Sequence, residues 1–270
     1  MKILKKITDL KTFTNKTSNL GFVPTMGGIH SGHISLINES KKKCNKTLVS
    51  IYINPKQFNS SKDFANYPKN FKKDLAILKK LNVNFVFIPN TSEIYREKRN
   101  QKIVLNKDHK ILCAKFRKGH FEGVIDIMDR FIKLIKPKYI FMGKKDFQQL
   151  FIIKKYIKDK YKAKIYICKT VRDKNSIALS TRNSLLSKND IKIASLVVKK
   201  LKKLKRIIAK NDKKKHYIVL TKKYLKKKYK IKIDYLEARN QHNLKTFTKN
   251  NKFLLFIAYY INKVRLIDNF

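Results

Sequence analysis

Two histidines, His30 and His33, are separated by a serine and a glycine and follow a glycine pair. Residues 20–23 are apolar and partly β-branched, which predicts a buried strand that Pro24 ends. The glycines permit a tight turn, and the apolar spacing after His33 predicts a helix. A helix N-terminus offers unpaired N–H groups and a positive dipole end, which suit a phosphate. Two imidazoles there could donate hydrogen bonds to a phosphate whose charge grows in a transition state.

Polar residues follow three further apolar runs that predict strands. In an open parallel sheet, ligands bind beyond the carboxyl ends of the strands. We therefore expect all of these polar stretches to converge on one cleft. They are residues 24–33, 54–58, 143–149 and, after the last run, 170–172 with 179–183.

Strand-like and helix-like segments alternate over the first two thirds of the chain. The expected strands are 20–23, 47–53, 83–88, 139–142 and 164–168, and the expected helices are 33–44, 71–81, 121–136 and 146–159, the last capped by Asp146. Residues 2–19 are a polar lead-in with room for a short helix. This alternation predicts an α/β fold with a Rossmann-like, doubly wound parallel sheet.

The pattern changes after about residue 183. Long basic helices are expected at 188–209 and 217–229, followed by strands at 231–237, 252–259 and 264–267. We therefore predict two domains: residues 1–182, which bind the ligands, and residues 183–270, a small α+β lid.

The composition favours a globular protein of a reducing compartment. The chain has 270 residues and 43% hydrophobic content, enough for a full core. Three scattered cysteines, Cys44, Cys113 and Cys168, argue against a disulfide framework and indicate the cytoplasm. The N-terminus lacks the apolar run of a signal peptide, and the longest apolar run, 253–261, is too short to span a bilayer. We expect no membrane partner.

The formal net charge of +48 admits two interpretations. It could serve binding to nucleic acid or an anionic membrane, or it could reflect genome-wide drift toward lysine, asparagine and isoleucine. Only nine of the 66 cationic residues are arginine, the residue favoured for bidentate readout of bases and phosphates. The lysines are also spread over most predicted helices. We therefore favour drift and expect no specific nucleic-acid partner.

The polar stretches resemble, in order along the chain, the motifs of the pantothenate synthetase family of His-x-Gly-His nucleotidyltransferases. The resemblance covers essentially the whole chain. It is carried by Pro24-Thr25-Met26-Gly27-Gly28-Ile29-His30-Ser31-Gly32-His33, Asn54-Pro55-Lys56-Gln57-Phe58, Tyr67-Pro68, Phe116 to Val124, Gly143-Lys144-Lys145-Asp146, Leu179-Ser180-Thr181-Arg182, Asp234 to Glu237 and Arg265 to Asn269. Lys144 replaces the usual glutamate of the family, and Lys73 replaces an acid that often precedes the residue equivalent to Asp74.

The resemblance implies an ATP-dependent, AMP-forming ligase that condenses pantoate with β-alanine through a pantoyl adenylate, uses Mg²⁺ and forms a homodimer. It makes His33 and His30 the catalytic residues, Gln57, Gln149 and Tyr67 the substrate-binding residues, and Asp74 a candidate magnesium ligand. The implied nucleotide-binding residues are Pro24, Thr25, Met26, Gly27, Gly28, Ile29, His30, Ser31, Gly32, His33, Gly143, Lys144, Lys145, Asp146, Val171, Leu179, Ser180, Thr181 and Arg182.

Alternative interpretations accompany these assignments. Another adenylyltransferase of the same superfamily would share the histidine loop, and a basic nucleic-acid-binding protein would share the charge. Gln57 could cap a helix, Lys145 could be one more solvated lysine, Asp74 could be a surface acid and Tyr67 could simply pack. His120 is expected to order a loop or cap a helix rather than to take part in chemistry.

Overall fold

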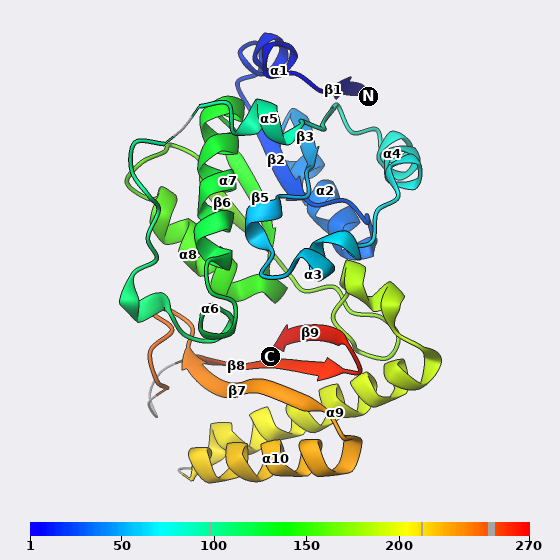
Figure 1. Ribbon diagram of the computed structural model, residues 1–270, viewed down its shortest axis with the longest axis vertical. Coiled ribbons are helices and arrows are strands. Elements are labelled where there is room, and N and C mark those ends of the chain that lie inside the picture. Colours follow the sequence, from blue (N-terminus) through cyan, green and yellow to red (C-terminus); the bar gives the residue numbers. More distant parts are fainter. Residues whose placement is uncertain (98, 212, 248–251) are drawn as a thin grey trace. The chain divides into compact units, whose positions relative to one another are not determined.

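The computed structural model describes residues 1–97, 99–211, 213–247 and 252–270. The chain forms two compact units (Figure 1). Unit 1 contains Met1–Lys110 and Arg117–Thr170, and unit 2 contains Ile111–Phe116 and Val171–Phe270. The chain therefore leaves unit 1, contributes a short segment to unit 2 and returns before it crosses for the last time.

Unit 1 is built on a six-stranded sheet in the order β1-β4-β3-β2-β5-β6, and every neighbouring pair is parallel. Its strands are β1 (Lys2–Leu4), β2 (Leu20–Thr25), β3 (Lys46–Ile51), β4 (Phe85–Phe87), β5 (Tyr139–Gly143) and β6 (Lys164–Cys168). Its helices are α1 (Ile7–Thr14), α2 (Ser31–Lys43), α3 (Ser61–Ala65), α4 (Phe71–Lys80), α5 (Thr91–Ile94), α7 (His120–Ile135) and α8 (Phe147–Ile157), with short 3-10 turns η1 (Pro55–Gln57), η2 (Lys107–His109) and η3 (Lys144–Asp146).

Both faces of this sheet are covered by helices. Successive side chains of a strand point to opposite faces. Val23 of β2 joins the core formed with α2 and α4, whereas the adjacent Phe22 makes an edge-to-face contact with Phe131 of α7. The sheet is therefore doubly wound, as predicted.

Pro24 does not end its strand, contrary to the prediction, because β2 continues to Thr25. The main-chain polar groups of β2 alternate between its neighbours: the Leu20 carbonyl accepts a hydrogen bond on the β5 side, and the Thr25 carbonyl accepts one on the β3 side. Pro24, which lacks an N–H, therefore faces β5. Pairing between β2 and β5 ends at Phe22, so no ladder hydrogen bond is lost.

The polar lead-in also forms more structure than expected. Residues Lys2–Leu4 pair in parallel with β4 and become an edge strand, and α1 follows. A three-residue edge strand carries too few residues to show a period of two in the sequence.

Unit 2 is an antiparallel sheet covered by two helices. The strands β7 (Lys232–Asn240), β8 (Phe253–Ile261) and β9 (Val264–Asn269) pair in that order. Helix α9 (Lys188–Lys210) begins with a capping box between Ser187 and Asp190 and packs against β8 and α10 (Lys214–Tyr229) (Figure 1). The unit also contains α6 (Cys113–Phe116) and the 3-10 turn η4 (Thr181–Leu185).

The division between the units differs from the expected boundary at 182/183. Arg172 forms a bridge with Ala178 and donates to both carboxylate oxygens of Asp268 in β9, at 2.6 and 2.8 Å. These contacts attach residues 171–182 to the small sheet, so the second and longer segment of unit 2 begins at Val171. A guanidinium–carboxylate pair between residues 96 positions apart leaves no local signal in the sequence.

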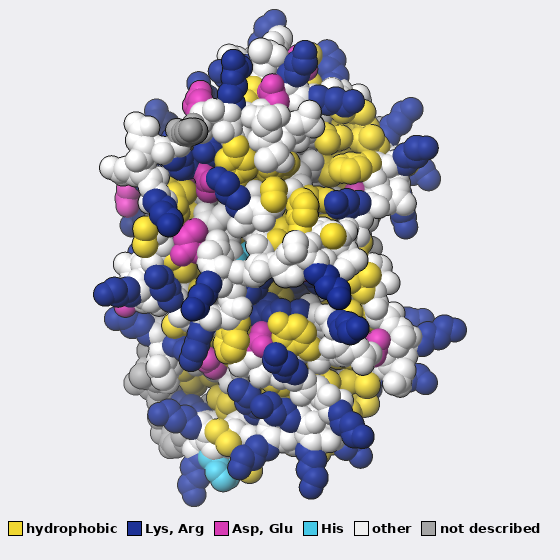
Figure 2. Space-filling model, viewed as in Figure 1, with side chains coloured by type: hydrophobic (Ala, Val, Ile, Leu, Met, Phe, Trp, Pro, Cys, Tyr) yellow, Lys and Arg dark blue, Asp and Glu magenta, His cyan; other side chains and the backbone are white. Residues whose placement is uncertain are grey.

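The surface is strongly basic. Figure 2 shows lysine and arginine side chains scattered over both units, with few acidic side chains between them. No helix within the described ranges is both long and apolar enough to cross a membrane.

Candidate active site

The glycine loop between β2 and α2 is held in place by a buried carboxylate. Gly27 and Gly28 both adopt positive φ, at 80° and 64°, which glycine accommodates without strain. Asp74 of α4 is 2% exposed, and its two oxygens accept the N–H groups of Gly28 and Ile29, each at 2.8 Å. The Asp74 side chain of α4 therefore holds the loop in this conformation.

His30 occupies the N-cap position of α2 and fixes the start of the helix. Its Nδ1 accepts the N–H of Gly32 at 3.0 Å. In a neutral imidazole the other nitrogen then carries the proton, so Nε2 of His30 is a hydrogen-bond donor. The capping hydrogen bond thus fixes the tautomer of His30, and its Nε2–H can donate to a phosphate at this helix N-terminus.

His33 lies against His30, with 4.1 Å between the ring centroids and 31° between the planes. Its Nδ1 is buried and has no partner at full hydrogen-bond geometry in the described part of the chain, although the Gly28 backbone is near enough to act on the ring. A buried polar atom left unpaired costs free energy, and such exceptions in native structures are often found at functional sites. The His30–His33 pair is therefore the first feature of unit 1 to which we assign chemistry.

Both imidazoles are held in the neutral form. Burial lowers the pKa of His30 to about 4, and the Lys145 ammonium adds to this effect while Asp146 opposes it. Burial lowers the pKa of His33 to about 3, helped by His30 and Lys145, while a backbone hydrogen bond at Gly28 acts in the opposite direction. At neutral pH the pair can donate hydrogen bonds but carries no charge.

The loop after β5 supplies the cation of this site. Strand β5 is the direct neighbour of β2, and Lys145 of η3 is close enough to act on both histidines. Lys145 also forms an ion pair with Asp146 at 3.6 Å. Asp146 stands at the N-cap of α8, but its side chain makes no capping hydrogen bond, so the predicted cap was wrong. The short 3-10 turn η3 leads directly into α8.

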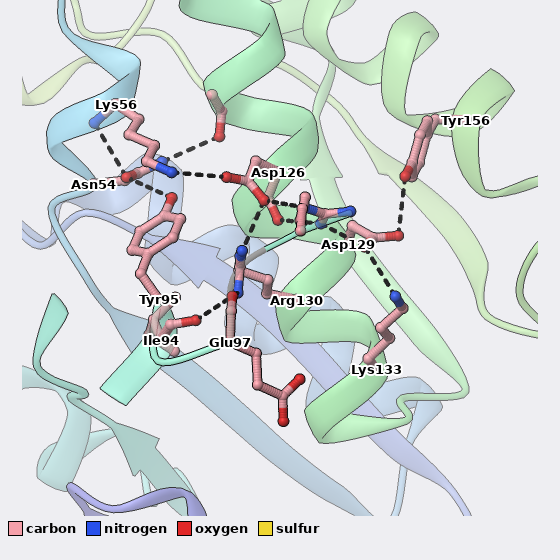
Figure 3. A network of polar contacts seen from close by, with 12 residues as sticks. Asn54, Lys56, Ile94, Tyr95, Glu97, Asp126, Asp129, Arg130, Lys133 and Tyr156 are labelled. Atoms are coloured by element: carbon pink, nitrogen blue, oxygen red, sulfur yellow. Dashed lines mark hydrogen bonds and ion pairs between the residues drawn. The ribbon is translucent and has the colours of Figure 1, made fainter. Parts of the chain in front are cut away.

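The loop after β3 carries Gln57 and is anchored on α7. Asn54 is 1% exposed, donates to the Gly123 carbonyl at 3.1 Å, and accepts from the Lys56 N–H and the Tyr95 hydroxyl (Figure 3). A Cβ on Gly123 would stand 2.2 Å from the Lys56 carbonyl oxygen, so only glycine allows α7 to approach the loop this closely. Gln57 follows directly as the last residue of η1.

The other two predicted substrate residues take different positions. Gln149 lies half-buried on α8, beside Gln148, which is buried and donates to the His109 carbonyl. Tyr67 is buried and makes an edge-to-face contact with Phe58, at 5.6 Å between the centroids. Its ring therefore packs against the end of the Gln57 loop, and its predicted contact with substrate stays a prediction.

An ion-pair network that the sequence did not predict connects α7 with the loop that carries Gln57. Asp126 and Asp129 of α7 are paired with Arg99, and Asp126 also with Arg130 and Lys56 (Figure 3). Burial opposes ionisation of both carboxyls, but the hydrogen bonds they accept outweigh it and hold the pKa of each below its ordinary value. The spacing of apolar residues in the sequence indicated the apolar face of α7 but gave no sign that these two aspartates form ion pairs.

A cavity of about 810 Å³ borders this network rather than the histidines. Lys56, Tyr95, Arg99, Glu122, Asp126 and Arg130 are among the residues that line it. None of the predicted site residues does so. We therefore base the candidate active site on the loops at the carboxyl ends of β2, β3 and β5, not on this cavity.

The remaining predicted nucleotide residues belong to unit 2. The Val171 carbonyl accepts the Leu179 N–H at 3.0 Å, and the Ser180 hydroxyl caps η4 by accepting the Arg182 N–H at 3.3 Å. Thr181 and Arg182 are half-buried in this turn. The structure therefore places the histidine loop, the Gln57 loop and the Lys145 turn after the adjacent strands β2, β3 and β5, and forms an ordered turn from residues 179–182 in unit 2.

Asp74 does not fit a magnesium site. Both of its oxygens already accept backbone N–H groups, and it is almost fully buried. Across the described ranges no cluster of three or more His, Cys, Asp or Glu side chains could hold a metal ion. The expectation that Asp74 binds Mg²⁺ is therefore replaced by a structural role in the glycine loop.

Comparison with known proteins decides the family. A family model described as pantoate-beta-alanine ligase matches residues 2–270. The chain belongs to this family. The pantothenate synthetase of Ruthia magnifica subsp. Calyptogena magnifica is 40% identical over 255 residues, covering 93% of this chain and 90% of the relative. That of Carboxydothermus hydrogenoformans is 34% identical over 278 residues, covering 100% and 98%.

Solved structures of the pantoate–β-alanine ligase family share the fold. Pantothenate synthetase from Thermus thermophilus superposes with a TM-score of 0.91 at 26% identity, covering 100% of this chain and 99% of that one. The pantoate–β-alanine ligase from Francisella tularensis, complexed with beta-gamma ATP and β-alanine, gives 0.81 at 32% identity, with 100% and 97% covered. The family, the fold class and the ligase activity expected from the sequence are thereby confirmed.

Proposed function

We propose that this chain joins pantoate to β-alanine in two steps. In the first step, a pantoate carboxylate oxygen attacks the α-phosphorus of ATP, and pyrophosphate leaves with the electron pair of the broken P–O bond. In the second step, the β-alanine amine attacks the carbonyl carbon of the pantoyl adenylate. AMP leaves, the amine loses a proton, and pantothenate forms.

The observation that carries this proposal is the neutral, closely packed His30–His33 pair at the N-terminus of α2, beside Lys145. A helix N-terminus attracts phosphate, and the neighbouring ammonium adds a positive charge. We assign His33 and His30 as donors to the charge that develops on the α-phosphate, a form of electrostatic stabilisation. Neutral imidazoles can serve because the role requires an N–H, not a charge.

The other roles follow from the loops. Gln57 and Gln149 would hold pantoate, the first from the loop after β3 and the second from α8. Tyr67, whose ring packs against Phe58, would also bind substrate. Lys145, Ser180 and Arg182 would hold the phosphates, and Met26, Gly143, Asp146 and Val171 the adenosine side. Pro24, Thr25, Gly27, Gly28, Ile29, Ser31 and Gly32 would shape the loop around the nucleotide, with Lys144, Leu179 and Thr181 beside it.

The proposal also covers magnesium, the oligomeric state and the cellular compartment. Magnesium would act with the ATP phosphates, and we assign it no protein ligand, because Asp74 is engaged elsewhere. The protein would be a homodimer, which size-exclusion chromatography with light scattering tests directly. It would work in the cytoplasm, in keeping with its three buried free cysteines.

A release assay tests the reaction. The protein is incubated with ATP and pantoate, with and without β-alanine, and AMP, pyrophosphate and pantothenate are measured. We expect stoichiometric AMP and pantothenate only when all three substrates are present. Without β-alanine, we expect at most one pyrophosphate per active site. Steady AMP release without pantoate, or with unrelated acids at the same rate, would instead support a different adenylyltransferase.

A further inference from the structure

The backbone carbonyl of Gln57 lies in a closed ring of hydrogen bonds. It contacts His120 Nδ1 at 2.7 Å and accepts from Arg117 Nη2 at 3.1 Å. Arg117 Nη1 contacts His120 Nε2 at 2.9 Å, which closes the ring. All three residues belong to unit 1. We call Arg117 and His120 the Gln57 clamp.

The hydrogen-bond chemistry of the ring fixes the state of His120. A carbonyl can only accept, so Nδ1 must carry a proton. A guanidinium can only donate, so Nε2 must accept and cannot carry one. The ring is complete only with a neutral imidazole in the Nδ1–H form. His120 thus cannot serve as a proton donor or acceptor for substrate while the clamp is closed.

The rest of the loop is already held from the other side. Asn54 fixes the start of η1 against Gly123 and Tyr95, and Phe58 packs against Phe64 and Tyr67 at its end. The Gln57 carbonyl is the point between these anchors that the clamp fixes. Its position sets the peptide plane after Gln57, and with it the direction in which the Gln57 side chain leaves the backbone.

We propose that Arg117 and His120 are positioning residues that aim the Gln57 side chain at pantoate, acting only through the backbone of that residue. The inference rests on the proposed role of Gln57 in pantoate binding. When the carbonyl of a residue is already fixed, ligand binding to its side chain does not lose the conformational entropy of ordering the loop. Displacement of such a group by about 1 Å is enough to weaken a reaction by orders of magnitude.

Variants of His120 separate this role from a general structural one. The amide nitrogen of asparagine occupies the place of Nδ1, so His120→Asn keeps the donor to Gln57, whereas His120→Gln and His120→Leu lose it. We expect His120→Leu and His120→Gln to raise the KM for pantoate about tenfold, as loss of one partly buried hydrogen bond does. His120→Asn should stay within about twofold of wild type. The KM for ATP should barely change in all three. His216→Asn, on the exposed face of α10, controls for loss of an imidazole.

A double-mutant cycle decides whether the clamp acts through Gln57. Gln57→Ala alone tests the proposed function, and an unchanged KM for pantoate in that variant would refute the role of Gln57 itself. If Gln57→Ala raises the KM, adding His120→Leu should raise it no further. An additional tenfold loss in the double variant, or equal damage to the KM for ATP, would overturn the clamp. Thermal unfolding of each variant shows whether it is folded. If His120→Leu does not fold, the comparison of His120→Asn with His120→Gln provides the test.

Discussion

The Asp74 carboxylate accepts the backbone N–H of Gly28 at 2.8 Å, although the two residues are 46 positions apart. Its second oxygen accepts the next amide along the chain, that of Ile29. A side chain expected to hold a metal instead fixes the left-handed turn that precedes His30. Two hydrogen bonds to one carboxylate therefore connect the loop to α4.

Asp74→Asn should loosen this loop. The amide leaves one acceptor and turns an N–H₂ group toward a backbone N–H, so we expect the free energy of unfolding to fall by about 1–3 kcal/mol. Turnover should fall as the histidines lose their fixed positions. The Mg²⁺ concentration for half-maximal activity should stay the same. A tenfold rise in that concentration without loss of stability would restore the metal-ligand assignment, and Asp9→Asn on α1 provides the exposed control.

His33→Ala should lower kcat by on the order of 10²–10³, as loss of an oxyanion-type donor does. ATP binding should change much less, because the contact strengthens mainly in the transition state. Steady-state kinetics with ATP titrated at saturating pantoate measures both quantities. Turnover at the wild-type rate in this variant would rule out the assigned role.

The lowered pKa values of His30 and His33, about 4 and about 3, predict how stability depends on pH. Between those values and the ordinary 6.5, the unfolded chain binds protons on these residues and the folded chain does not. Stability from the pair is therefore fully present above about pH 6.5 and is lost as pH falls toward 4 and 3. Denaturant unfolding across about pH 4 to 8 should show a shallower pH dependence of stability for His30→Asn/His33→Asn than for wild type. Identical slopes would mean that the imidazoles are not held neutral.

Gln57→Ala and Gln149→Ala should each weaken pantoate binding by roughly 1–3 kcal/mol for a lost buried partner, while ATP binding stays nearly unchanged. The neighbouring Gln148 provides a matched control, because it is buried and donates to the His109 carbonyl at 3.2 Å. Gln148→Ala should lower thermal stability and leave pantoate binding intact. Isothermal titration with each ligand distinguishes these outcomes, and equal losses for both ligands would indicate misfolding.

The net charge of +48 predicts weak, sequence-independent binding to nucleic acid that falls steeply with salt, because it arises from counterion release alone. Nuclease treatment should not change activity. Added salt should raise thermal stability by screening repulsion between lysines. A salt titration of RNA and DNA binding beside melting curves tests this. A sequence-selective complex that survives physiological salt, tighter than the roughly 10⁻⁴–10⁻⁶ M of non-specific binding, would refute drift.

The sequence predicted the sheet well because five of its six strands are mostly apolar runs bounded by turn residues. The sixth, β1, is too short for any period to show. The loops of the site were also predictable, since strand ends place them at one edge. The groups that hold those loops were not: Asp74, Asn54 and the Asp126–Arg99 pair act over 27 to 69 residues, and no spacing pattern records such contacts. His120 was expected to order a loop, and its contact with Gln57 confirms this.

The return of the chain at residues 111–116 has a consequence for protein synthesis. Cys113 is buried against the Tyr235 hydroxyl, 122 residues further along, and lies 3.7 Å from Arg265. At about 5–20 residues per second, the ribosome needs roughly 6–24 s to make Tyr235 after Cys113. Unit 1 can complete its sheet in that interval, but Cys113 cannot make its contacts with Tyr235 and Arg265 until those residues have been synthesised.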